Sequence, residues 1–420
     1  MKSRGKSLIM FLGVISLALV LLPGCGGEKS GSEPPGMDPG GHNPPPAPPG
    51  QHEGEVGNPP DEAAPDDSID SPRTSAMETS AEERFSKVEV FYATDRLRVE
   101  PSKPDQRYGS ERNLEGDHLE YGKAFITIPE THTPGKIERP KWWKFEFREN
   151  PDKHVTVMEP TLMEEGEFYQ SIHTTAKARP ADEVLMFIHG FNVPWGHAMR
   201  RTGQISHDLG FGGVTFCYSW PSQGSLKKYP ADKQNSDWTI PHLTKVLVDL
   251  QEKAKVGKIH VVAHSMGTRA LSYAIANAKN SGHELNLSNI ILAAPDIDRD
   301  IFAEQILPKI EGHTALLTMY ASSDDEALKV SRSFNGSDRL GLSGNNIFVL
   351  PDRMDTVDAS GIDTSLLGHS YYGSQQAVVK DIFGVIVEGL LPADRKLKPG
   401  DFGEWDLPLE ILAPVVEPEP

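Results

Sequence analysis

The chain has 420 residues, of which 60 are acidic and 42 basic, so it carries a net charge of −18. An acidic chain does not adhere to nucleic acid or to anionic lipid through its overall charge, and we expect no nucleic-acid partner. Its two cysteines exclude a disulfide framework, and no Cys/His spacing suggests a metal site, so the sequence predicts neither metal nor cofactor.

Residues 1–24 are typical of a signal peptide. A short basic region is followed by an apolar run at 7–22 and then by Leu22-Pro23-Gly24-Cys25, which resembles a bacterial lipobox. We expect Cys25 to be acylated and to become the first mature residue, which makes the net charge −21 and ties the protein to the membrane through lipid. An ordinary signal peptide and a membrane-spanning anchor are the alternatives. The lipid anchor predicts a location in the cell envelope. In a double-membraned bacterium we expect the outer membrane, because the residue after Cys25 is Gly26 instead of the Asp that marks retention in the inner membrane.

Residues 25–80 are rich in Pro, Gly, Asp and Glu and contain no aromatic side chain. Such a composition cannot build a core and predicts a disordered tether. Residues 81–390 are long enough for a single α/β domain, whereas residues 391–420 are Pro-rich and predict an extended tail.

Apolar runs inside the domain predict a strand order that alternates with helices in the later part. The expected strands are 88–92, 124–128, 184–188, 214–218, 258–262, 289–293, 315–320 and 346–350, and the expected helices are 195–208, 241–254, 268–278, 301–310, 326–332 and 371–388. This alternation predicts an α/β fold with a doubly wound, mostly parallel sheet and helices on both faces. The charged and aromatic region 136–181 has no clear period, and its role stays open.

The third predicted strand is followed by His189-Gly190-Phe191, in which Gly190 allows a close backbone approach. We expect the amide of Phe191 to be one of two donors to an oxyanion. His189 is interpreted as a structural histidine that bonds its own loop. Trp195 and Trp220 follow the third and fourth strands, where they either flank a pocket mouth or pack in the core.

Ser265 lies between a β-branched run and a helical pattern, in Ala263-His264-Ser265-Met266-Gly267. Small residues two positions before and after a serine on such a turn are typical of the nucleophile elbow of the α/β-hydrolase fold. The sequence therefore predicts Ser265 as a nucleophile and the amide of Met266 as the second oxyanion donor.

A serine nucleophile requires a base, and the base requires an orienting acid, in the chain order serine, acid, histidine for this fold. His369 lies between the last predicted strand and the last helix, where the base is expected, whereas His283 and His313 fall in loops that we expect at the surface. The acid is expected after the seventh strand, at Asp325 or Asp324. Asp296 and Asp298, after the sixth strand, are alternatives, and one of these residues can instead cap a helix.

Taken together, these stretches resemble a bacterial α/β-hydrolase family of unknown function that is related to lipase-like serine hydrolases. The matching segments lie between residues 86 and 390 and include 90–96, 187–192, 218–222, 263–267, 293–298, 320–328 and 368–371. The resemblance implies the fold and the Ser265/His369 pair, and it assigns the acid to Asp325. Asp95 stands where asparagine is more usual, a departure that we expect to affect an edge strand only.

We therefore expect a lipid-anchored serine hydrolase that cleaves carboxylic esters, of the esterase or lipase type, with a small-molecule or lipid ester as substrate. The alternative is a non-catalytic envelope scaffold or binding protein that retains the hydrolase fold. The polar connection 221–240 does not read as a lipase lid, which favours short or medium acyl chains.

Overall fold

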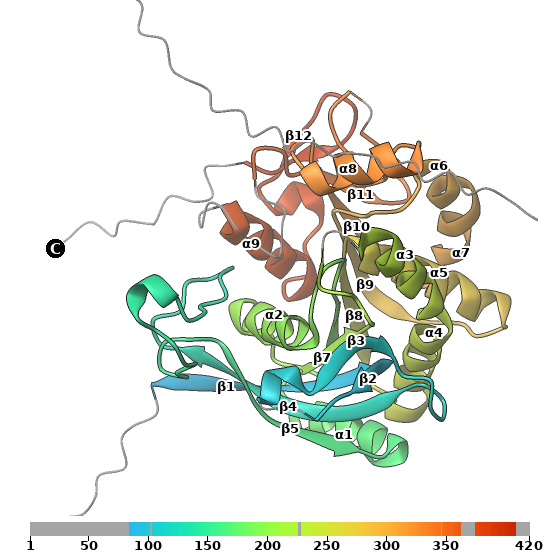
Figure 1. The fold of residues 1–420 in the computed structure, drawn as a ribbon. Helices are drawn as coiled ribbons and strands as arrows, with labels where there is room; N and C mark the ends of the chain where they lie inside the picture. The colour runs from blue at the N-terminus through green and yellow to red at the C-terminus, as the bar shows by residue number, and fades with distance from the viewer. Residues whose placement is uncertain (1–83, 101–102, 226–227, 346, 363–373, 409–420) are drawn as a thin grey trace, which may run out of the picture. The chain divides into compact units, whose positions relative to one another are not determined.

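The computed structural model describes residues 84–408, apart from 101–102, 226–227, 346 and 363–373 (Figure 1). All of these belong to one compact unit. Within them, eleven strands form a single sheet, whose centre is parallel because each strand returns through a helix. The central strands are, in spatial order, β7 (Val214–Ser219), β6 (Glu183–Ile188), β8 (Lys258–His264), β9 (Leu287–Ala293), β10 (Thr314–Ala321) and β11 (Asp355–Asp358).

Both ends of the sheet depart from the parallel pattern. Next to β7 lie β1 (Phe85–Thr94), β4 (Glu120–Pro129) and the edge strand β5 (Thr156–Met163), of which β4 and β5 are antiparallel to their neighbours. Next to β11 lie β13 (Trp405–Asp406) and β12 (Lys398–Pro399). A separate hairpin consists of β2 (Arg96–Arg98) and β3 (Tyr108–Arg112).

The pairing of β4 with β5 contains a bulge. Lys123 pairs with Thr161, whereas Phe125 pairs with Met158, so that the register shifts between the two pairs. Glu159 lies in the extra stretch and has a positive φ of 51°, and Pro160 follows it. Proline in a strand is tolerated at a bulge or on an edge, because it has no N–H to donate to a ladder.

Helices cover both faces of the sheet. Buried side chains of α2 (Trp195–Asp208) and α9 (Ser374–Ile386) pack on the face that carries Phe187 and Val262. The opposite face, with Met186 and Val261, is covered by α1 (Glu165–Ala178), α4 (Ile240–Asp249), α5 (Met266–Asn280), α6 (Arg299–Ile301) and α7 (Leu307–Ile310). Figure 1 shows α2 and α9 on one side of the sheet, and α4, α5 and α7 on the other. Burial on both faces explains why the central strands are continuously apolar.

Most of the predicted elements agree with the structure, and α2 has the predicted bounds. The strand that follows β10 is β11 at 355–358 instead of the predicted 346–350, where Leu350 makes only an isolated bridge to Met354. The domain end predicted at 390 is too early, because β12 and β13 continue the sheet beyond it. None of the helices in the described part of the chain is long and apolar enough to cross a membrane.

The sequence did not predict two helices, which lie in different parts of the fold: α3 (Tyr229–Trp238) packs on α4 and α5, whereas α1 packs on β4 and β7. One is α3, in the connection after β7 that was expected to be merely polar. Its buried residues are Asp232, Asn235 and Ser236, so no apolar stripe marks it in the sequence. The other is α1, and a further predicted helix, α8 (Glu326–Asn335), begins as expected after β10.

Candidate active site

Ser265 lies on the turn that joins β8 to α5. Its φ is 51° and its ψ −122°, a left-handed conformation that is costly for a residue with a side chain and is found mainly at functional sites. The turn is held by the Ser265 amide, which donates to Ala293 O at 3.0 Å, and by Thr268, whose amide donates to Ser265 O at 3.0 Å. Ser265 is half-buried between two buried neighbours, so it is the accessible residue of this turn.

The small residues around Ser265 have a steric reason. A Cβ on Gly267 would lie 2.4 Å from the carbonyl oxygen of His189 and 2.8 Å from that of Ile188. Ala263 is completely buried in the core on the other side of the turn. The turn therefore requires glycine at 267, and it accepts no large side chain at 263.

The loop after β6 packs directly on this turn. A Cβ on Gly190 would lie 2.7 Å from His264 Nδ1 and 2.9 Å from Ser265 Cβ, so only glycine permits the approach. Phe191 follows it and is half-buried. Within the described residues, the amides of Phe191 and Met266 have no hydrogen-bond acceptor, and Met266 begins α5, where the helix dipole favours negative charge.

Arg96 is a completely buried residue that fixes the loop after β6. Burial lowers its pKa to about 10, so it remains a cation at neutral pH. Its guanidinium lies within hydrogen-bond distance of Ser219 Oγ (2.9 Å), Gly109 O (3.0 Å), Ser222 O (3.1 Å), His189 Nε2 (3.2 Å) and Val193 O (2.7 Å). Two of these partners, His189 and Val193, lie on either side of Phe191 in the chain.

The contact with Arg96 also determines the protonation of His189. A guanidinium only donates, so His189 Nε2 accepts, and the ring proton lies on Nδ1, which donates to Gly190 O at 2.8 Å. Burial, together with the charge of Arg96, holds the pKa of His189 well below its ordinary value. The ring stacks on Trp220 at 5.0 Å. His189 therefore bonds its own loop, as predicted.

Asp232 of α3 holds the same loop from outside the sheet. This buried carboxylate accepts from the Asn192 amide at 3.0 Å, the Ser222 hydroxyl at 2.7 Å and the Gln223 amide at 2.6 Å. Ser222 Oγ in turn accepts from the Val193 amide at 3.0 Å. The residues on both sides of Phe191 are thus fixed by buried, charge-assisted hydrogen bonds.

The two aspartates after β10 have different surroundings. Asp325 is half-buried and caps α8, with Oδ1 accepting from the Leu328 amide at 2.9 Å. Asp324 is exposed, and its Oδ2 accepts from the Gly361 amide at 2.7 Å. Both lie at the carboxyl end of a parallel strand, the edge of the sheet at which Ser265 also lies.

The aspartates after β9 take part in structural contacts. Asp296 is buried and accepts from the Tyr229 hydroxyl at 2.7 Å and the Ser331 hydroxyl at 2.5 Å. Asp298 caps α6 by accepting from the amides of Asp300 and Ile301, each at 3.0 Å. These bonds join the loop after β9 to α3, α8 and the start of α6.

The predicted base His369 falls in residues 363–373, outside the described part of the chain, as does the predicted lipidation site Cys25. In the chain, His369 lies between the end of β11 and the beginning of α9, and its role as the base stays a prediction. Of the two other histidines considered, His283 is exposed, but His313 is buried at the start of β10, which corrects its assignment to the surface.

Two further predictions can be compared with the structure. Trp195 and Trp220 are both fully buried, so they pack in the core and do not flank a pocket mouth. Asp95 is buried at the end of β1, which is not an edge strand, and accepts from Thr239 Oγ1 at 2.5 Å and His242 Nδ1 at 2.8 Å. Cys217 is a buried free thiol, and burial raises its pKa to about 12.

One group of side chains in the described residues has ligand atoms close enough for a metal ion: His132, His207 and Asp208. His132 Nδ1 lies 2.8 Å from Glu138 Oε2, and its Nε2 lies 2.8 Å from Asp208 Oδ1. Burial alone lowers the pKa of His132, but its hydrogen bonds to Asp208 and Glu138 raise it to about 9. A protonated imidazolium that bridges two carboxylates accounts for these contacts without a metal.

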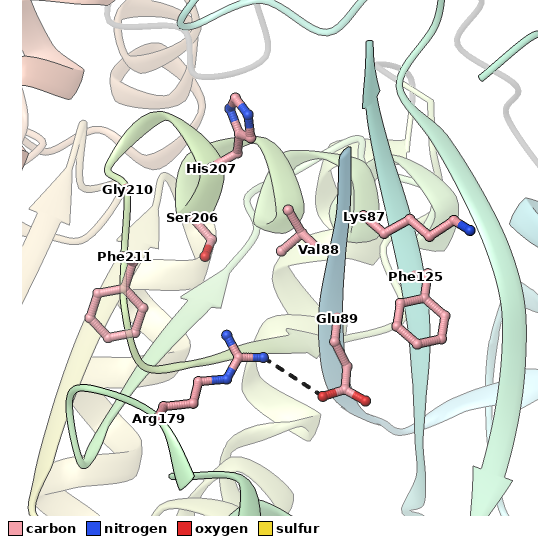
Figure 2. Close-up of a pocket in the computed structure, with 9 residues that line it drawn as sticks. All are labelled: Lys87, Val88, Glu89, Phe125, Arg179, Ser206, His207, Gly210 and Phe211. Carbon is pink, nitrogen blue, oxygen red and sulfur yellow. Dashed lines mark ion pairs between the residues drawn. The ribbon is translucent and has the colours of Figure 1, made fainter. Parts of the chain in front are cut away.

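A cavity of about 470 Å³ lies beside this cluster (Figure 2). It is lined by Lys87, Val88, Glu89, Phe125, Arg179, Ser206, His207, Gly210 and Phe211. Figure 2 shows Arg179 paired with Glu89, at 3.8 Å. Lys87–Glu89 lie at the beginning of β1, which runs parallel to the central strands, whereas Ser265 follows the end of β8. The cavity therefore lies at the amino ends of the parallel strands, whereas Ser265 lies at their carboxyl ends.

Solved structures that are similar to this chain share little of its sequence. No curated protein matches the sequence. Among solved structures, a hormone-sensitive lipase from a metagenome library is similar at 11% identity, with 54% of this chain and 99% of that chain covered and a TM-score of 0.31. An esterase from Pyrobaculum calidifontis is similar at 12% identity, with 49% and 76% covered and a TM-score of 0.29.

The family comparison covers the elements that build the site. Residues 164–386, from α1 to α9, match the model of a family described as "Alpha/beta hydrolase of unknown function (DUF900)". This segment is more than half of the chain, and it contains the loop after β6, the turn at Ser265 and the acidic residues after β10. The chain belongs to this family of α/β-hydrolases.

Proposed function

We propose that this protein is a serine hydrolase that cleaves carboxylic esters through an acyl-enzyme. The observation that carries the proposal is the left-handed conformation of Ser265 on a strand-to-helix turn, with the Gly190 loop packed against its Cβ. A strained, well-supported serine at the carboxyl edge of a parallel sheet is what an α/β-hydrolase requires of its nucleophile.

In the proposed reaction, Ser265 Oγ attacks the ester carbonyl while His369 takes the hydroxyl proton. The amides of Phe191 and Met266 donate to the oxyanion, and His369 then returns the proton to the leaving alcohol. Water, deprotonated by His369, then attacks the acyl carbon, and His369 returns this proton to Ser265 Oγ as the bond to the acyl group breaks and the acid leaves. Asp325 holds the imidazole in the tautomer that this exchange needs.

Asp325 is the proposed acid for three reasons. It follows β10, the strand after which the acid of this fold is expected, and the family resemblance assigns it. It is half-buried, whereas Asp324 is exposed and bonded to the Gly361 amide. Asp296 and Asp298 are each engaged by at least two donors of the loop after β9 and its neighbours.

We further propose that the enzyme is held in the cell envelope by a lipid on Cys25 and connected to it by residues 26–80. The basic and apolar segment before Cys25 and the acidic Pro-rich stretch after it support this proposal. In a double-membraned bacterium, Gly26 after the cysteine favours the outer membrane.

The proposed substrates are esters with short or medium acyl chains. The connection after β7, where a mobile apolar lid would be expected in a lipase, contains α3, whose buried residues are polar. Asp232 ties this helix to Asn192 and Ser222, so it is a fixed part of the site. A series of nitrophenyl esters checks this: a rate that keeps rising beyond about twelve carbons would contradict it.

The experiment that tests the proposal is labelling with a fluorophosphonate, which reacts with activated serines. We expect the full-length protein to be labelled and Ser265→Ala to lose all labelling. Ser272→Ala is a matched control on the same helix, because Ser272 is fully buried and its hydroxyl has no hydrogen-bond partner among the residues that the structure describes. Labelling that survives Ser265→Ala would overturn the assignment. Absence of both labelling and ester turnover would favour a non-catalytic scaffold.

A further inference from the structure

Residues Lys141–Arg148, here called the aromatic loop, expose four large aromatic side chains in eight positions. Trp142 is 74% exposed, Trp143 61%, Phe145 83% and Phe147 76%. Figure 1 shows this segment, coloured between the blue-green of β4 and the green of α1, projecting away from the sheet. Isolated exposed apolar residues are ordinary, but a contiguous group of this kind marks an interaction site.

The aromatic loop has a defined conformation. The Lys144 amide donates to Lys141 O at 2.8 Å and the Phe145 amide to Trp142 O at 3.0 Å, which forms one tight turn that ends with a left-handed Phe145. Glu146, its only acidic residue, accepts from the Lys141 amide at 3.0 Å and contacts His154 at 3.3 Å. The carboxylate is thus bonded within the loop and to its base, while the aromatic side chains point to solvent.

The charge of the aromatic loop is opposite to that of the protein. Lys141, Lys144 and Arg148 form no ion pair within the described residues, and Lys141 instead lies 5.6 Å from the Trp143 ring. These three cations stand among exposed Trp and Phe in a chain of net charge −18. Tryptophan prefers the headgroup region of a bilayer, and lysine and arginine next to it attract anionic lipid.

We propose that the aromatic loop is an interfacial anchor, whose Trp142, Trp143, Phe145 and Phe147 insert into the headgroup region of an anionic phospholipid bilayer. Aromatic side chains supply the apolar contact, and the cations supply the preference for anionic lipid. This contact needs neither a lipid on Cys25 nor catalysis by Ser265. In a protein that is also lipidated at Cys25 and active through Ser265, the aromatic loop brings the hydrolase domain itself to the bilayer surface.

The test uses the full-length protein with vesicles that contain phospholipid brominated near the headgroup, which quenches tryptophan fluorescence on contact. We expect quenching with vesicles that contain about one quarter phosphatidylglycerol, and weaker quenching with phosphatidylcholine alone. Trp142→Ala/Trp143→Ala loses most of the quenching. The matched control is Trp238→Phe, which removes a half-buried tryptophan held by Arg112 and His242 and leaves the quenching in place.

The contribution of charge is tested by Lys144→Glu/Arg148→Glu. We expect this variant to lose the preference for phosphatidylglycerol, whereas Lys329→Glu/Arg332→Glu, with the same change in net charge on exposed positions of α8, keeps it. Quenching that is absent, or that the double alanine variant retains, overturns the proposal. An equal preference for phosphatidylglycerol in the two charge-reversal variants also overturns it. A dimer that Trp142→Ala/Trp143→Ala abolishes, without lipid quenching, shows that a second copy covers the loop instead.

Discussion

Gly190 lies so close to Ser265 that a Cβ at position 190 would come within 2.9 Å of the serine Cβ. The loop after β6 and the turn after β8 therefore form one packed unit, and a shift of either moves the other. Since Phe191 follows Gly190 and Met266 follows Ser265, the two proposed oxyanion donors are positioned by the same contact. The geometry of the site therefore requires glycine at position 190, because a side chain there would separate the two segments.

Gly190→Ala tests this dependence. The added methyl group forces the loop away from Ser265, so the Phe191 amide no longer reaches the oxyanion. Loss of one such donor costs about 10²–10³ in kcat, and we expect a fall of this size with little change in KM. Gly166→Ala is the control, because a Cβ there meets nothing within 4 Å. Steady-state kinetics on a nitrophenyl ester measure both variants, and an unchanged kcat in Gly190→Ala would contradict the packed arrangement.

Asp325→Asn tests the acid. Asparagine preserves the cap of α8 but reverses the tautomer that the acid imposes on the base, so we expect kcat to fall by about 10⁴ with the fold intact. Asp324→Asn and Asp298→Asn are the controls and should lose far less. If Asp298→Asn is the inactive variant and Asp325→Asn keeps most of its rate, the acid lies after β9.

Arg96→Lys tests the buried cation behind the oxyanion loop. Lysine has a single ammonium group and cannot replace the planar set of donors that reaches Val193, His189 and Ser219. We expect a loss of about 2–4 kcal/mol in the free energy of unfolding, because buried acceptors lose their donors, and a lower kcat in the folded fraction. Arg98→Lys, which changes an exposed arginine that pairs with the half-buried Glu120, should change stability by less than about 0.5 kcal/mol. Urea denaturation measures both.

The stability of the protein should depend on pH through His132. Because its pKa in the folded protein is raised to about 9, the bridge to Asp208 and Glu138 contributes fully below the unfolded pKa near 6.5 and is lost as the pH rises through about 9. We expect the free energy of unfolding to fall between pH 6.5 and 9.5. In His132→Gln this fall should be absent. His283→Gln, at an exposed pair with Glu252, should keep it, and an equal slope in all three proteins would exclude His132 as its source.

The sequence predicts the parts of the site that are local in the chain. Ser265 is visible because a buried strand, a turn with small residues and a helix follow one another within about 20 positions. The hydrogen bonds that hold the site in place join residues that are far apart in the sequence. Arg96 and Ser222 are 126 positions apart, and Asp232 and Asn192 are 40 apart. No periodic pattern marks such contacts, since a buried arginine and an exposed one look alike in a sequence.

Other differences have equally physical causes. The helix α3 buries polar residues, so its sequence lacks the apolar stripe on which helix prediction depends. The run before Leu350 is more apolar than β11, yet β11 is the segment that pairs with β10. Trp195 and Trp220 are buried, whereas Trp142 and Trp143 are exposed, and the residue type alone does not distinguish these cases.

The bulge at Glu159 and Pro160 affects what can happen at the outer edge of the sheet. An exposed edge strand offers unpaired N–H and C=O groups to any other extended chain. In β5 the ladder is interrupted by a residue with positive φ and by one without an N–H, so a second molecule cannot extend the sheet in register along the whole strand. Even where many copies lie close together, β5 therefore does not favour aggregation through pairing with a strand of another molecule.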